Sequence, residues 1–249
     1  MTGLKQRAAA IARSLDTYYR DQERTERMDQ LNASFVTKGG LAFDIGAHVG
    51  DRTASFLRLG ASVVALEPQP SVFRALKLIH GRANNVVLLC QAVGAETGEI
   101  TMHLNTANPT VSTASHDLIA TASSDENWQG QVWDSQIEVP VTTLDQLITQ
   151  HGEPDFVKID VEGHELDVLL GLSAPIPALS FEFTTIQRDV ALACIERLKQ
   201  LGRYEFNVSL GEDHHLRHTT WISPLALRDE IDRLPSSVNS GDVYARRLI

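Results

Sequence analysis

Compact apolar runs alternate with amphipathic segments along the central part of the chain. Residues 41–45, 62–67 and 85–91 are apolar runs of strand length. Between them, residues 51–59 and 71–82 place apolar side chains at helical spacing, and Ser71 stands where an N-cap is expected. Strands that alternate with helices in this way are typical of βαβ units. The pattern therefore predicts an α/β fold with a doubly wound, mostly parallel sheet.

The second half continues the pattern with further elements. Residues 154–160 and 178–183 are predicted strands, residues 190–201 a helix, and residues 204–209 and 242–246 a final strand pair. Thr143 reads as the N-cap of a helix that reaches about residue 150, and another helix ends near Gly171. Residues 99–104 and 136–141 alternate as half-exposed strands do. The roughly thirty polar residues between them predict a mobile flap, with a disordered surface loop as the alternative.

The first 38 residues form a separate unit in the prediction. They are charged and polar, with Ala8, Ile11 and Leu15 at helical spacing, and they end at the hinge Lys38-Gly39-Gly40. We expect a helical extension over residues 1–38 that packs on a domain spanning residues 39–249. The alternative is a lid in which Tyr18, Tyr19 or Arg20 touches the substrate.

Composition narrows the classes of function. The chain has 249 residues, 43% of them hydrophobic, and a formal net charge of −10, which disfavours a nucleic-acid partner because such partners need clustered Lys and Arg. Cys90 and Cys194 have no C-x-x-C spacing and are expected to be buried free thiols. Neither a membrane-spanning apolar run nor a signal sequence is apparent, so a cytoplasmic protein without membrane contact is expected.

A glycine-rich turn follows the first predicted strand. Its pattern, Asp44-x-Gly46-x-x-x-Gly50, lacks the G-x-G-x-x-G spacing of dinucleotide sites. An acidic residue at this point suits a ligand with a cationic amino group better than a pyrophosphate, which it would repel. Glu67 ends the second strand about twenty residues beyond the turn, where α/β folds place a carboxylate that accepts ribose hydroxyls.

A second motif follows the strand at residues 154–160. The run Lys158-Ile159-Asp160-Val161-Glu162-Gly163-His164-Glu165, together with the glycine turn and Glu67-Pro68, resembles the FkbM family of S-adenosylmethionine-dependent methyltransferases. The resemblance covers about residues 40–185, and Gly241-Asp242-Val243 is similar to the closing strand of the family. His48 departs from the Asn that many members carry at this position.

The resemblance implies a class I methyltransferase fold, in which a seven-stranded sheet has the order 3-2-1-4-5-7-6 and an antiparallel last strand. It also implies O-methylation of a hydroxyl on a sugar, glycan or natural-product small molecule, without naming the acceptor. Asp44 is expected to contact the ammonium of S-adenosylmethionine, Glu67 its ribose, and Gln91 and Ala92 its adenine. The full set of expected cofactor contacts is Asp44, Gly46, Ala47, His48, Gly50, Glu67, Gln91, Ala92 and Asp160.

Methyl transfer to an alcohol also needs a base for the hydroxyl proton. We expect Asp160, Glu162 and His164 to be the catalytic residues, with Glu162 or His164 as the base and Asp160 orienting the acceptor or the cofactor. Glu165 is a candidate for the same site, or alternatively a structural residue in an ion pair with Lys158.

Two sets of possible ligand residues raise the question of a metal. Asp160, Glu162 and Glu182 have the oxygen ligands that divalent cations prefer, but nothing in the sequence brings them together, so no metal is expected. Residues 212–218, which hold three histidines, are interpreted as a solvated loop at the acceptor pocket. A catalytically silent binding protein or, less favoured, a nucleic-acid methyltransferase are the alternative functions, and a homodimer is compatible with the sequence.

Overall fold

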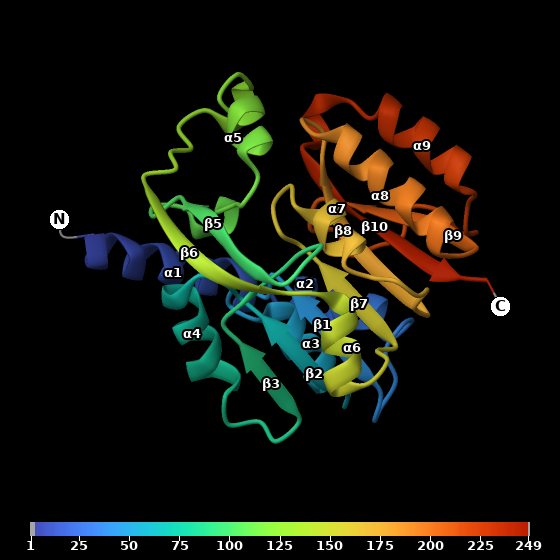
Figure 1. Ribbon diagram of the computed structural model, residues 1–249, viewed down its shortest axis with the longest axis horizontal. Helices are drawn as coiled ribbons and strands as arrows, with labels where there is room; N and C mark the ends of the chain where they lie inside the picture. Colours follow the sequence, from blue (N-terminus) through green and yellow to red (C-terminus); the bar gives the residue numbers. More distant parts are fainter. Residues whose placement is uncertain (1–2, 249) are drawn as a thin grey trace.

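The computed structural model describes residues 3–248 and is built around a seven-stranded sheet (Figure 1). Its order is β3-β2-β1-β7-β8-β10-β9, which is the predicted class I methyltransferase order. β10 runs antiparallel to both of its neighbours, and the other pairs are parallel. The strands are β1 (Leu41–Ile45), β2 (Ser62–Leu66), β3 (Val86–Leu89), β7 (Phe156–Ile159), β8 (Ala178–Thr184), β9 (Tyr204–Leu210) and β10 (Ser240–Arg247).

Helices cover both faces of this sheet. Phe43 and Ile45 of β1 belong to the core on the side of α6 (Leu144–His151), α7 (Glu165–Leu170), α8 (Arg188–Leu201) and α9 (Pro224–Arg233). Ala42 belongs to the core on the other side, with α2 (Gln22–Asn32), α3 (Asp51–Arg58) and α4 (Pro70–His80). Successive side chains of a strand point to opposite faces, so a strand covered on both faces must be apolar throughout. This explains the compact apolar runs in the sequence.

Several predicted boundaries need correction. Ser71 is not an N-cap: Gln69 takes that position and Pro70 opens α4, because the fixed φ of proline suits the first helical residue. The third strand is shorter than predicted, and α9 was not predicted. Thr143 is confirmed as an N-cap, since its hydroxyl accepts a hydrogen bond from the Gln146 N–H at 3.2 Å.

The segment predicted to be a mobile flap, with a disordered loop as the alternative, contains secondary structure. It connects two strands of a second sheet, which has the order β4-β6-β5. The strands of this sheet are β4 (Ala92–Val93), β5 (Gly98–Leu104) and β6 (Ser135–Thr142). The 105–134 segment carries the short helix α5 (His116–Ala122), at the top of Figure 1, and two 3-10 turns (Pro109–Val111 and Glu126–Trp128). Leu118, Ala122 and Trp128 are buried together, and Val111 and Trp133 pack against them, so a few scattered apolar residues give this segment a small core.

The N-terminal extension consists of α1 (Gly3–Tyr19) and α2, as predicted. α2 packs against α3, and Met28 and Leu31 of α2 are buried. Cys194 is a buried free thiol as expected, whereas Cys90 is only half-buried. Of the helices within residues 3–248, none is both long and apolar enough to cross a membrane.

Candidate active site

A cleft opens at the carboxyl ends of β1, β2 and β7. It encloses about 950 Å³ of empty space, part of which is open to solvent. The segment after β5 contributes Thr110 and Ser112 to its wall, α1 contributes Tyr18, and the loop after β9 contributes Glu212. The predicted site residues that line it are Asp44, Gly46, Ala47, His48, Glu67, Gln91, Ala92, Asp160, Glu162 and His164.

The two glycines of the turn allow close contact with different parts of the structure. Gly46 has a φ of 79°, and a Cβ there would lie 1.7 Å from the carbonyl oxygen of Asp160, so this glycine lets the β1 and β7 loops touch. Gly50 packs against α4 instead, where a Cβ would lie 2.5 Å from Leu76 Cδ1. The N–H groups of Gly46 and Ala47 donate to the Leu66 carbonyl, so they hold the turn against β2.

Asp44 is fully buried and only partly hydrogen-bonded. Its Oδ2 accepts a hydrogen bond from Thr53 Oγ1 at 2.6 Å, while its Oδ1 has no partner within residues 3–248. Burial raises the pKa of this carboxyl, and nearby Lys158 opposes the shift. A buried carboxylate oxygen without a partner is costly, so the arrangement favours a cationic or hydrogen-bond-donating ligand in the cleft.

Glu67 is also buried, with 3% of its surface exposed. Its two oxygens accept hydrogen bonds from the N–H groups of His48 (3.0 Å) and Gln69 (2.8 Å). Burial raises the pKa of this carboxyl to about 7, although both N–H groups lower it. A carboxylate has about four acceptor positions, so each oxygen can still accept from a ligand hydroxyl.

The loop after β7 is fixed by its own side chains and by the folded 105–134 segment. Glu165 Oε1 accepts from the N–H groups of Val161 and Gly163, both at 3.1 Å. Lys158 pairs with Asp160, so the alternative ion pair between Glu165 and Lys158 is wrong. Thr113 Oγ1 donates to the Glu162 carbonyl at 2.6 Å and thereby ties this loop to the segment above it.

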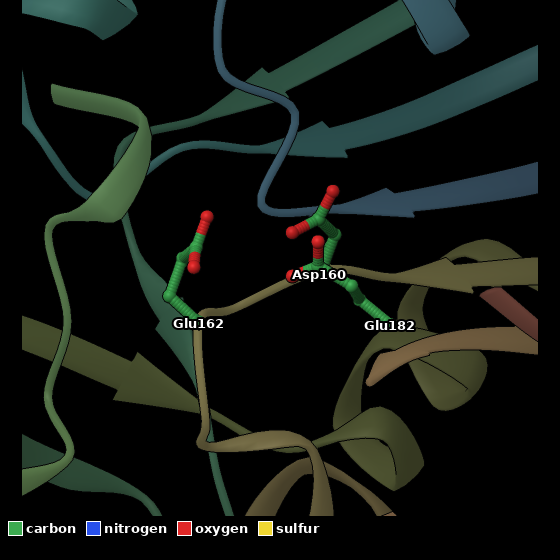
Figure 2. Close-up of side chains that lie close together, drawn as sticks. All are labelled: Asp160, Glu162 and Glu182. Atoms are coloured by element: carbon green, nitrogen blue, oxygen red, sulfur yellow. The ribbon is translucent and has the colours of Figure 1, made fainter. Parts of the chain in front are cut away.

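Three carboxylates meet beside this loop. Oxygen atoms of Asp160, Glu162 and Glu182 lie within 4.8 Å of one another, and Figure 2 shows the three side chains grouped around it. Burial and the neighbouring Asp160 raise the pKa of Glu162 and of Glu182 well above the usual range. The sequence offered no reason for this convergence, which depends on the pairing of β7 with β8.

His164 lies in the cleft wall beside this group. Its Nδ1 is 3.3 Å from Asp167 Oδ2, so Nδ1 carries the proton and Nε2 is the acceptor nitrogen. Burial lowers the pKa of the imidazole. The neutral ring is therefore the form that faces a substrate at neutral pH.

A network of ion pairs that sequence reasoning missed joins the N-terminal extension to the cleft. Arg24 of α2 donates to Asp51 at 2.9 Å and also to Glu212, and Arg52 contacts the same two carboxylates. The two guanidiniums hold the pKa of Glu212 well below its usual range. His214 is 3% exposed, so the interpretation of residues 212–218 as a solvated loop is wrong at this position. No local signal marks Arg24, because its partners are distant in sequence.

The strand order, the glycine turn and the carboxylate after β2 together define a class I methyltransferase domain. Residues 44–216, more than half of the chain, match the model of the methyltransferase FkbM domain. The protein belongs to the FkbM methyltransferase family.

One curated relative and several solved structures are similar to the chain. Hexuronic acid methyltransferase AglP of Haloferax volcanii is 31% identical over 153 residues, which are 59% of this chain and 56% of that protein. The chain thus spans little more than half of this relative's length. An O-methyltransferase from Bacillus cereus, solved with SAH, has a TM-score of 0.46 at 12% identity and covers 100% of this chain and 91% of its own. A precorrin-6y C5,15-methyltransferase from Geobacter metallireducens has a TM-score of 0.45 at 14% identity, with 89% and 88% covered.

Proposed function

We propose that this protein transfers the methyl group of S-adenosylmethionine to a hydroxyl of a sugar unit, free or within a glycan. The observation that carries the proposal is the pair of buried carboxylates, Asp44 and Glu67, on either side of the glycine turn in a chain of the FkbM family. The similarity to a hexuronic acid methyltransferase supports a sugar as the acceptor.

The donor half of the cleft fits this cofactor. S-adenosylmethionine carries its methyl group on a cationic sulfonium, so the group that leaves is a neutral thioether that needs little further activation. The unpartnered Oδ1 of Asp44 suits its ammonium, and the two oxygens of Glu67 suit the ribose diol. Gln91 and Ala92 line the cleft after β3, where the adenine is expected.

The acceptor half is polar on several sides, as a sugar requires. Thr110, Ser112 and Glu212 line it together with the phenol of Tyr18. We assign the role of base to His164, since Asp167 holds its Nδ1 proton and leaves Nε2 to accept the hydroxyl proton. Asp160, which Lys158 holds by an ion pair, has the role of orienting the acceptor.

Calorimetric titration and transfer of a labelled methyl group test this function. The wild-type protein should bind S-adenosylmethionine and S-adenosylhomocysteine. Asp44→Asn should weaken the binding of S-adenosylmethionine about 10- to 100-fold, as the loss of a charged hydrogen bond does. Asp117→Asn on α5, which lies outside the cleft lining, is the matched control.

The transfer assay should use a panel of hexoses, hexuronic acids and their oligosaccharides, and mass spectrometry should locate the methyl group on an oxygen. Absence of cofactor binding by the wild-type protein would refute the proposal. Methylation of nitrogen or carbon, or of nucleic acid alone, would refute the sugar acceptor.

A further inference from the structure

The three carboxylates after β7 and β8 crowd acidic groups into one place. Asp160, Glu162 and Glu182 bring oxygens within 4.8 Å of one another. Lys158 pairs with Asp160 and so balances one of the three. Carboxylates this close together, buried or half-buried, repel one another when they are ionised, and a bound divalent cation removes that repulsion.

A second observation concerns a buried polar atom beside Glu182. Gln187 is 5% exposed, and its Oε1 has no hydrogen-bond partner within residues 3–248. Its side chain lines a cavity of about 10 Å³ that Glu182 and Gly163 also line. Such a volume is about that of one water or one ion. The amide oxygen lies so close to Gly163 that a Cβ there would be 2.4 Å from it, so it faces the loop that carries Glu162.

The geometry points to a divalent-cation site formed by Asp160, Glu162 and Glu182, with Gln187 Oε1 as a further oxygen, direct or through a water. Carboxylate and amide oxygens are hard ligands, which suit Mg²⁺, Mn²⁺ or Ca²⁺ rather than zinc or copper. Asp160 keeps 31% of its side chain exposed, and it lines the cleft with Glu162. The cation can therefore enter from the cleft and face the acceptor.

The position suggests what the cation contributes. A divalent ion at the acceptor end of the cleft would bind hydroxyl or carboxylate oxygens of a sugar and make a bound hydroxyl more acidic. This role rests on the proposed function, whereas binding of the ion does not. The proposal replaces the expectation, drawn from the sequence, that the site holds no metal.

Titration of the full-length protein with Mn²⁺, followed by electron paramagnetic resonance, tests the site without donor or acceptor. One Mn²⁺ should bind per chain, and Mg²⁺ or Ca²⁺ should compete. Glu182→Gln should weaken Mn²⁺ binding by more than roughly tenfold, and Gln187→Leu should weaken it by roughly tenfold. Glu196→Gln is the matched control, because it makes the same change on α8 at an exposed residue that bonds Lys199; it should leave Mn²⁺ binding unchanged.

Each outcome supports or refutes the cation site. No binding of Mn²⁺ to the wild-type protein at about 1 mM overturns the site, as does equal binding by wild type and Glu182→Gln. S-adenosylhomocysteine affinity, measured on the same samples, shows whether each variant is folded; if Glu182→Gln is not, Gln187→Leu decides. Methyl transfer without Mn²⁺ binding would refute this inference alone. Mn²⁺ binding without methyl transfer would leave the site standing and refute the proposed function.

Discussion

Gly46 and Gly130 have almost the same left-handed backbone, with φ of 79° and 85°, but very different surroundings. A Cβ on Gly46 would collide with the Asp160 carbonyl, whereas a Cβ on Gly130 would meet nothing within 4 Å. The pair separates the cost of the backbone conformation from the cost of the contact between the β1 and β7 loops.

Gly130→Ala should lower the free energy of unfolding by about 1–2 kcal/mol, the cost of a side chain in the left-handed region. Gly46→Ala should cost about 3 kcal/mol or more, because the two loops must also separate. Urea unfolding of the two variants measures the difference. Equal losses would show that the contact between the loops contributes nothing.

The proposed role of Glu67 predicts that donor binding depends on pH. Its pKa of about 7 lies above the ordinary value of 4.5, so the folded protein without ligand favours the protonated carboxyl. This contribution to stability is complete below pH 4.5 and is lost as the pH rises through 7. Ribose hydroxyls donate to the ionised form, so ligand binding releases a proton below pH 7.

We expect the dissociation constant of S-adenosylhomocysteine to be constant above pH 7.5 and about tenfold larger at pH 6 than at pH 8. Glu67→Gln should bind more weakly and lose this dependence. His48 stays neutral in this range because burial lowers its pKa to about 4. Calorimetry across the range measures both curves. An equal slope in the wild type and the variant would assign the dependence to another group.

At the scale of elements, two ion pairs join α2 to α3 in different environments. Arg24 is buried and contacts Asp51 and Glu212. Arg58 of α3 is more exposed and binds Asp29 of α2 through two hydrogen bonds of 2.7 Å. Only the first pair adjoins the cleft, so it is the one that holds the N-terminal extension beside the turn.

Arg24→Ala should lower the free energy of unfolding by roughly 3 kcal/mol, because it leaves Arg52 as the one guanidinium beside two carboxylates, of which Asp51 is largely buried. Arg58→Ala should cost at most about 1 kcal/mol, as exposed pairs do. Chemical denaturation measures both values. Arg24→Ala should also weaken donor binding, since Tyr18 then loses the Arg24 guanidinium that lies 5.1 Å from its ring. Similar losses for the two variants would contradict this distinction.

At the scale of the molecule, the cleft is shared by all the main parts of the chain. The large sheet, the small sheet, the N-terminal extension and the 105–134 segment each contribute residues to its wall. A ligand that contacts all of them should therefore stabilise the molecule as one unit rather than one part of it.

S-adenosylhomocysteine at about one hundred times its dissociation constant should add about 2.7 kcal/mol to the free energy of unfolding. For a chain of this size the melting temperature should rise by about 5–10 °C. Calorimetry should show a single transition that moves as a whole. A shift confined to one of two transitions would show that the ligand contacts an independent part.

The sequence by itself determined the elements of the large sheet and the position of Asp44 and Glu67 at the ends of two of its strands. Strands buried on both faces must be apolar, which made 41–45 and 154–160 recognisable, and the strand order followed from the family resemblance carried by short motifs. Asp44 and Glu67 could be found because each ends a strand beside a turn, where local spacing fixes the position. The polar 105–134 segment was misjudged because its three core residues are too sparse to show a period.

The tertiary structure alone decided which distant side chains meet. Arg24 and Glu212 are 188 residues apart, and Glu182 joins Asp160 and Glu162 only because β8 lies beside β7. Chain spacing constrains contacts within a turn or a helix, where the backbone geometry is known. It does not constrain the direction of side chains on separate elements, which follows from how those elements pack. The acceptor side of the cleft and the carboxylate group are of this second kind.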